Sequence, residues 1–253
     1  MDMDNFRALC RKIEDYTERV FQPLRPHLSA IGGFLIVASF IDYGSKGIIQ
    51  WDDCIWTPYR YNGLSRDLSR LFHLVDVVIQ LGGSGMVVLD WHSDYAALHL
   101  IGIWVAHELG YDTPMNPHLW WITLSRPAGL ALVLIDGAVK RGRLPAERRQ
   151  QLFWGVRALL ILTFSEWLFR RSRPLLFTIF GLSACTMLAV GPTHRWPAAI
   201  LVLALLNELL PRFLLSKRRD HGWEPNKELE LYPALSLIGG LVLLENMGAL
   251  GEV

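Results

Sequence analysis

Residues 27–51 of the chain read HLSAIGGFLIVASFIDYGSKGIIQW. No charged side chain occurs from residue 28 to residue 41, and the first two charges, Asp42 and Lys46, stand near the end of the stretch. About 20 apolar residues are enough for a helix to cross the hydrocarbon core of a bilayer. The stretch therefore predicts a membrane-spanning helix whose last turns carry charge.

Seven further apolar runs follow this one. Together the eight runs cover residues 27–51, 70–91, 95–111, 118–138, 149–169, 174–191, 195–215 and 230–248. The third run is short and contains His99, His107 and Glu108, so it either spans the membrane or lies re-entrant inside the protein. We therefore predict an all-α fold, a polytopic transmembrane helical bundle of about eight membrane helices, or seven if the third run is re-entrant.

The composition agrees with a membrane protein. Of the 253 residues, 51% are hydrophobic and 19% are charged, against about 25% charged in an ordinary soluble domain. Eight spans of about 20 residues use roughly 160 residues, which leaves room for tails and connections but not for an added soluble domain. The net charge of +1 gives no strong field for nucleic acid. The sequence predicts one transmembrane domain over residues 27–253 and no nucleic-acid partner.

The segment before the first run, residues 1–26, has a different pattern. Its apolar side chains recur at helical spacing with charges between them: Phe6, Leu9, Cys10, Ile13, Tyr16, Val20 and Phe21. This pattern predicts an amphipathic helix. The helix lies either at the membrane surface or on the protein itself.

Basic residues in short loops predict the orientation, because such loops stay in the cytosol. The loop at residues 139–149 holds Lys140, Arg141 and Arg143 and is the strongest cytosolic signal. With eight spans, both termini then lie in the cytosol and residues 52–69 lie in the lumen. The basic clusters at 170–173 and 217–219 fall on the luminal side.

Charged side chains inside the spans each need a reason, because burying a charge in the bilayer is costly. Asp42 and Lys46 are four residues apart and share a helix face. They either form a self-satisfied pair or leave Asp42 to meet a ligand. Arg157 has no opposite charge three or four residues away, so we expect a partner on another helix: Asp42, Asp76 or Asp136.

The second run contains a polar stripe formed by His73, Asp76 and Gln80, spaced three and four residues apart. The stripe lines a wet cavity or makes hydrogen bonds between helices. Arg126 and Asp136 stand nearer the ends of the fourth run, where they reach the interface.

Motifs for catalysis and metal binding are absent from the sequence. The three cysteines, Cys10, Cys54 and Cys185, form no CxxC pair, and no HExxH, GxSxG or P-loop pattern occurs. His92 and His99 share a helix face, but two imidazoles alone make a poor metal site. We predict no catalytic residue, no metal and no cofactor.

Several stretches resemble one known family. The first run carries Asp42, Gly44 and Lys46 and ends in Gln50-Trp51. The last run carries Leu235-Ser236-Leu237-Ile238-Gly239-Gly240-Leu241 and is followed by a glycine-rich stretch at residues 248–251. Shorter matches fall in the same order between them, at 87–89, 94–96, 129–133, 155–157 and 191–203. In these motifs the chain resembles the surfeit locus protein four family of endoplasmic-reticulum cargo receptors.

The resemblance implies a bundle related to DoxX-like membrane proteins. It also implies a receptor in the endoplasmic reticulum membrane, cycling with the early Golgi, that loads soluble secretory proteins into COPII vesicles. Its partners would be cargo amino termini, COPII coat components and membrane lipid. Two features depart from the family. Tyr43 replaces a second acidic residue, and the final residues 251–253 lack a dilysine-type retrieval signal.

A receptor for mature amino termini needs a carboxylate for the terminal ammonium and apolar walls for the first side chains. For this role the sequence offers Asp42 with Trp51, and Asp76 with Gln80 on the second span. Lys46 or Arg157 would keep the carboxylate ionised when cargo is absent. Two alternatives stay open: a membrane transporter or lipid-handling protein that uses the same polar groups, and a redox partner that only the fold relationship suggests.

Overall fold

The computed structural model describes residues 23, 25–55, 65–110, 120–170, 175–190, 195–216 and 225–249. The predicted amphipathic helix in residues 1–26 lies almost wholly outside them. The described residues form these helices: α2 (Arg25–Ile49), α4 (Arg66–Val88), α5 (Ser93–Gly110), α6 (Trp120–Lys140), α7 (Ala146–Arg170), α8 (Leu175–Val190), α9 (Arg195–Ser216) and α10 (Pro225–Ala249). Each helix matches one predicted apolar run, and the all-α prediction is confirmed.

Among the described residues, two helices are long and apolar enough to cross a membrane: His27–Ile49 and Arg66–Val88. Shorter apolar stretches occur at Pro197–Asn207 and Leu231–Leu244. Only 39% and 28% of the most apolar windows of the first two helices are buried, whereas the core helix of a soluble protein would be mostly covered. Large apolar side chains such as Phe72 instead lie exposed, as suits a surface that contacts lipid. That the other helices also span the membrane stays a prediction.

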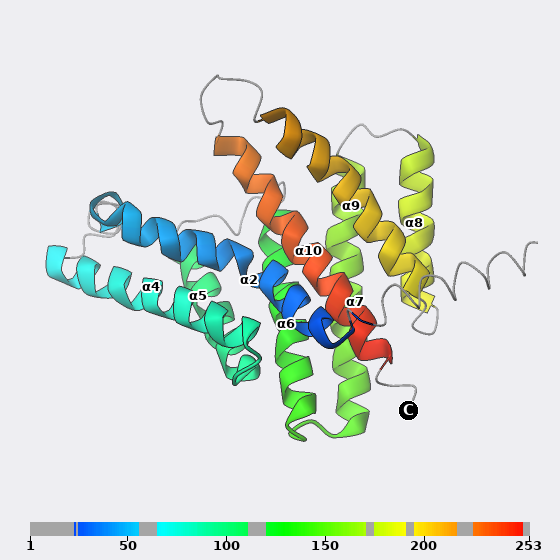
Figure 1. Cartoon of the computed structure of the whole chain (residues 1–253), viewed down its shortest axis with the longest axis horizontal. Coiled ribbons are helices and arrows are strands. Elements are labelled where there is room, and N and C mark those ends of the chain that lie inside the picture. Colours follow the sequence, from blue (N-terminus) through cyan, green and yellow to red (C-terminus); the bar gives the residue numbers. More distant parts are fainter. Residues whose placement is uncertain are drawn as a thin grey trace, which may run out of the picture.

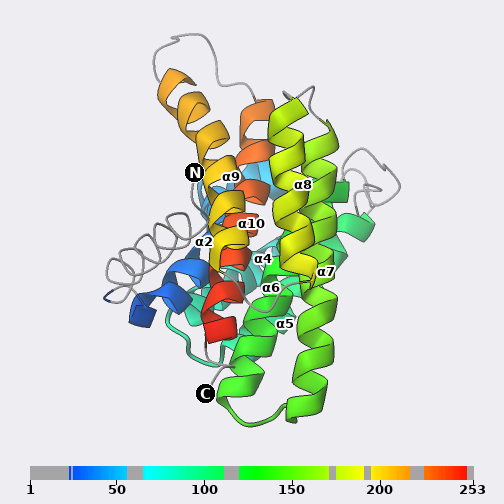
Figure 2. The same ribbon diagram turned by 90° about the vertical axis from the view of Figure 1, so that its right-hand side faces the viewer.

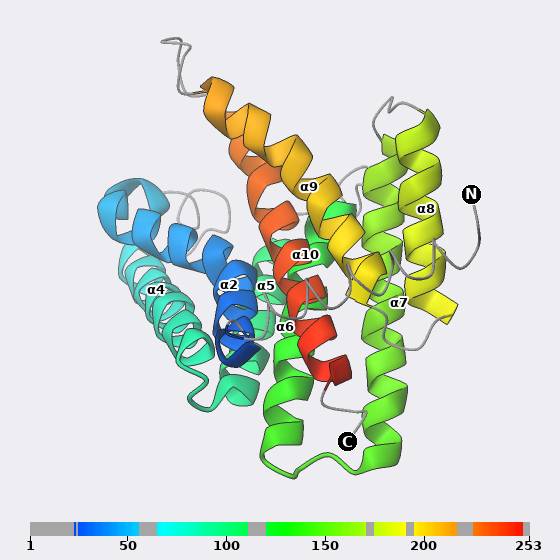
Figure 3. The ribbon, with the colours of Figure 1, turned by 45° about the vertical axis from the view of Figure 1, so that its right-hand side comes forward.

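The helices pack as two rings that share one pair. The first ring runs from α2 through α4, α5 and α6 to α10, which packs back against α2. The second runs from α6 through α7, α8 and α9 to α10, and the shared helices α6 and α10 also contact each other. Figure 1 shows α2 and α4 side by side and inclined to α6 and α7, and Figure 3 shows α10 between α2 and α9. The last helix of the chain therefore joins the two halves.

The contact between α2 and α10 depends on small residues. A Cβ atom added to Gly239 would lie 2.6 Å from the carbonyl oxygen of Gly32, and one added to Gly129 of α6 would lie 3.0 Å from the Ile36 side chain. Atoms cannot approach a backbone oxygen so closely without a shift of the helix. Glycine at these positions lets α2, α6 and α10 pack with their backbones close together.

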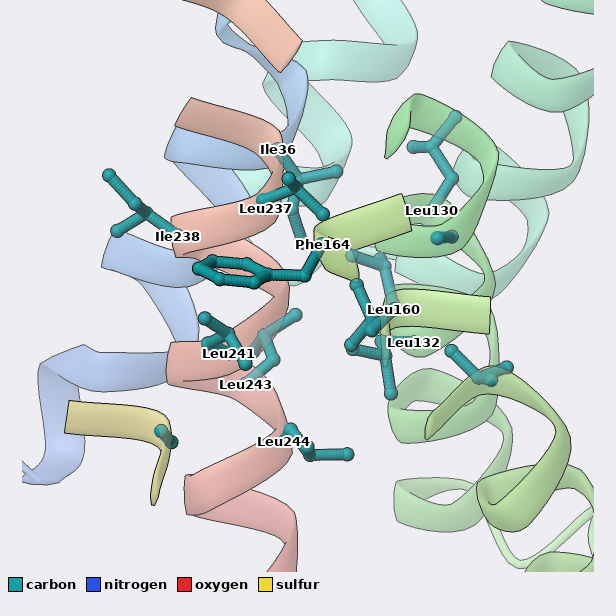
Figure 4. Packing of buried hydrophobic residues seen from close by; sticks show 14 of the residues in the cluster. Ile36, Leu130, Leu132, Leu160, Phe164, Leu237, Ile238, Leu241, Leu243 and Leu244 are labelled. Atoms are coloured by element: carbon teal, nitrogen blue, oxygen red, sulfur yellow. The ribbon is translucent and has the colours of Figure 1, made fainter. Parts of the chain in front are cut away.

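The apolar core lies where the two rings meet. Ile36 of α2, Leu132 of α6, Phe164 of α7 and Leu237 of α10 are all fully buried, and Figure 4 shows these side chains gathered around the Phe164 ring. On the outer side, α8 packs beside α7 and against α9 (Figure 2). Burial of Ile36 in this shared core anchors the middle of α2, the helix that carries Asp42 in its last third.

Candidate functional site

Asp42 and Lys46 form an ion pair on the last third of α2. Lys46 Nζ lies 2.8 Å from Asp42 Oδ2, and the two side chains remain 30% and 25% exposed, Lys46 first. The spacing of four residues places both groups on one helix face. The pair foreseen from the sequence is present, and its carboxylate is still partly open to the surroundings.

The polar stripe of α4 is also formed. Gln80 Nε2 donates to Asp76 Oδ1 over 2.8 Å. The other carboxylate oxygen, Asp76 Oδ2, lies 3.1 Å from Nε2 of His107 on α5. Sequence reasoning missed this contact: His107 stood out only as a polar residue in the short third run. The stripe therefore makes hydrogen bonds between helices, which was one of the two roles predicted for it besides lining a wet cavity.

Trp51 reaches the same stripe through a histidine. His73 Nε2 lies 2.9 Å from the carbonyl oxygen of Gly47, and the rings of Trp51 and His73 meet edge to face with centroids 4.8 Å apart. The absence of side chains at Gly44 and Gly47 brings α2 against α4, since a Cβ on Gly47 would lie 2.7 Å from Val77. We call Asp42, Lys46, Trp51, His73, Asp76 and Gln80 the α2–α4 polar group.

Within this group, three of the four predicted cargo-binding residues lie on α2 and α4, and the fourth, Trp51, lies in the helical turn just after α2. Trp51 is joined to α4 through His73, and Asp76 is joined to Gln80. Asp42 is joined to Lys46 of its own helix. A shared pocket of Asp42, Trp51, Asp76 and Gln80 stays a prediction.

Cys54 follows α2 in a single helical turn at residues 51–55. Burial raises the pKa of its thiol, and the carboxylates of Asp53 and Asp76 raise that pKa further. The thiol is therefore neutral at pH 7, and a neutral thiol is a weak nucleophile. Among the described residues, no cluster of three His, Cys, Asp or Glu side chains is suited to hold a metal ion.

Arg157, the predicted intramembrane charge partner on α7, is buried. Its guanidinium carbon lies 5.1 Å from the centroid of the Trp154 ring, within the range of a cation–π contact. The three carboxylates proposed as its partners are engaged elsewhere: Asp42 by Lys46, Asp76 by His107, and Asp136 by Lys140.

The opposite ends of α2 and α4 meet a second set of charges, which the sequence did not single out as a site. We call it the six-charge cluster; its members are Asp90, Asp94, Asp136, Lys140, Arg141 and Arg143. It joins the turn between α4 and α5 to the loop between α6 and α7. The basic loop read as a topology signal therefore also makes tertiary contacts.

Asp90 shapes the turn between α4 and α5. Its φ of 52° and that of His92, 51°, lie in the left-handed region, which non-glycine residues enter seldom but which Asp and His tolerate better than most. Ser93 Oγ donates to Asp90 Oδ1 over 2.9 Å, and Lys140 Nζ lies 2.7 Å from Asp90 Oδ2. These side-chain contacts hold the tight turn.

Asp94 is the buried centre of the cluster. Its Oδ1 contacts the Arg141 guanidinium and accepts the backbone N–H of Tyr95, and its Oδ2 lies 2.9 Å from Arg143 Nη1. The Arg143 guanidinium also lies over the Tyr95 ring, 4.7 Å from its centroid. A carboxylate with two guanidinium partners and a backbone donor is fully satisfied.

Asp136 completes the cluster from α6. Its side chain is buried and lies 2.8 Å from Lys140 Nζ, while Ser29 of α2 donates to it over 3.4 Å. That Asp136 lies near the membrane interface stays a prediction; within the protein, the Lys140 ammonium neutralises its buried carboxylate. This contact also ties the start of α2 to the end of α6.

Relatives of the chain match it over nearly its whole length. The model of the SURF4 family matches residues 7–253. "Surfeit locus protein 4 homolog" of Schizosaccharomyces pombe is 27% identical over 94% of this chain and 84% of its own length. "ER-derived vesicles protein ERV29" of Saccharomyces cerevisiae is 26% identical over 98% and 83%. The Drosophila melanogaster "Surfeit locus protein 4 homolog" is 23% identical over 94% and 92%.

No solved structure matches the chain. The family match, however, extends from the segment before α2 to the end of α10 and includes every helix that carries the α2–α4 polar group and the six-charge cluster. Its members are polytopic membrane proteins that are not known enzymes. The all-helical fold, the apolar surfaces of α2 and α4 and this end-to-end match agree: the chain belongs to the SURF4 family.

Proposed function

We propose that the chain is a cargo receptor of the endoplasmic reticulum membrane. It binds soluble secretory proteins in the lumen through their mature amino termini and loads them into COPII vesicles for transport to the Golgi. The support from relatives is the yeast protein named for ER-derived vesicles, which aligns with 98% of this chain.

The single observation that carries the binding site is the state of Asp42. Its carboxylate is partly exposed and paired with a lysine one turn away on the same helix. Such a local pair contributes little to stability and can exchange its cation. With the basic loop in the cytosol, as predicted, this end of α2 faces the lumen.

The ligand supplies the matching charge. Cleavage of a signal peptide leaves a free α-amino group with a reference pKa of about 8, which is mostly protonated in a neutral compartment. That ammonium can replace the Lys46 ammonium at Asp42. The edge-to-face rings of Trp51 and His73 offer an aromatic wall for the first side chains of the cargo.

The test compares two forms of one peptide, a mature secretory amino terminus with a free amine and the same peptide acetylated. Asp42→Asn should weaken binding of the free-amine peptide to the purified protein about 10- to 100-fold, because a charge-assisted contact is worth roughly 1.5–3 kcal/mol. The acetylated peptide should bind poorly to both proteins. If a folded Asp42→Asn protein binds the free-amine peptide as tightly as the unchanged protein, Asp42 is only the structural partner of Lys46.

A further inference from the structure

Six buried polar atoms on the helices of the first ring have no hydrogen-bond partner among the described residues. One of them, Ser69 Oγ near the start of α4, is about two turns before Asp76 in the helix. The other five are Ser39 Oγ of α2, Gln80 Oε1 and Ser84 Oγ of α4, Trp104 Nε1 of α5 and Arg126 Nε of α6. The side chains of Ser39, Gln80 and Ser84 are more than nine-tenths buried. An unsatisfied buried polar atom costs about 1–3 kcal/mol, so five together would cost as much as the whole stability of many proteins.

Contacts between the helices place these atoms at about the same level along the helix axes. The contacts between α4 and α5 show this for Gln80, Ser84 and Trp104. Asp76 of α4 contacts His107 of α5. These helices run in opposite directions, and Gln80 and Trp104 each lie one turn further along from that contact. One more turn along α4, a Cβ on Gly83, next to Ser84, would lie 3.2 Å from Leu100 of α5.

The contacts of α2 with α4 and α6 place Ser39 and Arg126 at the same level along the helix axes. A Cβ on Gly44 would lie 3.4 Å from the Cβ of Gln80. Its neighbour Tyr43 lies under the Arg126 guanidinium, with 5.4 Å from the guanidinium carbon to the ring centroid. Ser39 stands one turn from Tyr43 and one turn from Ile36, which packs at Gly129 of α6. The unsatisfied atoms on α2, α4, α5 and α6 therefore lie at similar levels along the helix axes.

The chemistry of this level favours an anion. Trp104 Nε1 and Arg126 Nε can only donate, the two serine hydroxyls can donate or accept, and Gln80 Oε1 can only accept. Among the described carboxylates, none forms an ion pair with Arg126. The two nearest along these helices, Asp42 and Asp76, are occupied by Lys46 and His107. Within the part of the chain that the structure describes, the Arg126 guanidinium faces the Tyr43 ring and no carboxylate.

We propose that four of these residues form a buried oxyanion site between α2, α4, α5 and α6, with Arg126 as its cation and Ser39, Ser84 and Trp104 as hydrogen-bond donors. Gln80 Oε1 can only accept, so its partner is a donor other than the anion. The ligand group is a phosphate or a similar multi-oxygen anion. It comes either from a lipid headgroup that enters beside the exposed Tyr43 or from solution. This site is separate from the contact proposed between cargo and Asp42.

The test uses the full chain purified in a maltoside detergent in phosphate-free buffer. Dioleoyl phosphatidic acid is compared with dioleoylglycerol, which has the same chains but no phosphate, and inorganic phosphate is compared with chloride at equal ionic strength. The readout is the shift of the melting temperature as each compound is added. A phosphatidic acid shift without a dioleoylglycerol shift indicates a lipid source, and a shift with inorganic phosphate indicates a soluble one.

Two variants and a control complete the test. Arg126→Gln should lower the apparent affinity for the effective phosphate compound at least tenfold, whereas Arg148→Gln, at an exposed arginine, should leave it unchanged. Ser84→Ala should keep or raise the melting temperature without ligand, because it removes an unsatisfied hydroxyl, and should reduce the shift with ligand. This second variant keeps the test decisive if Arg126→Gln fails to fold.

The proposal is overturned if neither phosphatidic acid nor inorganic phosphate raises the melting temperature of the unchanged protein. It is also overturned if Arg126→Gln and Ser84→Ala both respond as the unchanged protein does. In either case ordered water satisfies the five atoms.

Discussion

The two ends of α2 and α4 hold charges in opposite ways. At one end, the six-charge cluster joins residues far apart in sequence: Lys140 reaches Asp90, 50 residues away, and Arg143 reaches Asp94, 49 residues away. At the other end, Asp42 and Lys46 pair over four residues and stay partly exposed. Pairs between residues about 50 positions apart tie two segments together, and one of their carboxylates, Asp94, is buried although the Lys140–Asp90 pair is exposed. A pair within one helical turn joins no segments, and the Asp42 carboxylate stays 25% exposed. We expect the first arrangement to stabilise the fold and the second to leave Asp42 available for a ligand.

The largest effect is expected at Asp94. Asp94→Asn removes the buried charge that faces Arg141 and Arg143, and loss of one partner from a buried pair costs about 3–5 kcal/mol. Because both arginines keep some exposure, we expect a loss of roughly 2–3 kcal/mol in the free energy of unfolding. Thermal or denaturant unfolding in detergent would measure it.

The matched control is Asp67→Asn. Asp67 pairs with Arg70 at 3.4 Å, but its side chain is 94% exposed. Exposed pairs contribute about 0–1 kcal/mol, so this variant should unfold almost like the unchanged protein. Equal losses in the two variants would mean that the six-charge cluster does not hold the loops together.

A smaller effect is expected from Lys46→Gln, and its sign sharpens the contrast between the two ends. The local pair contributes about 0.3–0.5 kcal/mol to stability. Loss of the lysine should therefore hardly change the unfolding curve. It should leave affinity for a free-amine peptide unchanged or a few-fold higher, because the incoming ammonium no longer competes for Asp42. Titration with the peptide would measure this; a tenfold weaker affinity would show that Lys46 itself holds the ligand.

The same contrast explains what the sequence could predict. The Asp42–Lys46 pair was one of two readings of these residues, and Asp76 and Gln80 were placed on one helix face, because a spacing of four residues fixes neighbours on a helix. The eight helices were foreseen because apolar runs are continuous in sequence. His107 at Asp76 and Arg141 at Asp94 were not, because those contacts depend on which helices pack together, and neither spacing nor composition encodes that for a single chain.

The site is predictable to a similar extent. Asp42, Asp76 and Gln80 lie on the helices expected to carry them, and Trp51 lies in the helical turn that follows α2. His73 was expected on the polar stripe, but its contacts with Trp51 and Gly47 emerged only from the structure. The burial of Asp136 was missed because its neutralising partners, Lys140 and Ser29, come from the helix end and from another helix. A charged residue inside an apolar run indicates that its side chain makes a contact, but the sequence does not show with which residue.

The most direct test of the account is cargo loading into vesicles. Endoplasmic reticulum membranes from cells that lack their own family member would receive this chain, its Asp42→Asn variant or its Asp67→Asn variant, and COPII vesicles would be formed from them. The measurement is the fraction of a soluble secretory protein recovered in the vesicles. We expect the unchanged chain and Asp67→Asn to restore packaging and Asp42→Asn not to restore it. Equal packaging with Asp42→Asn, or none with the unchanged chain although it enters the vesicles itself, would contradict it.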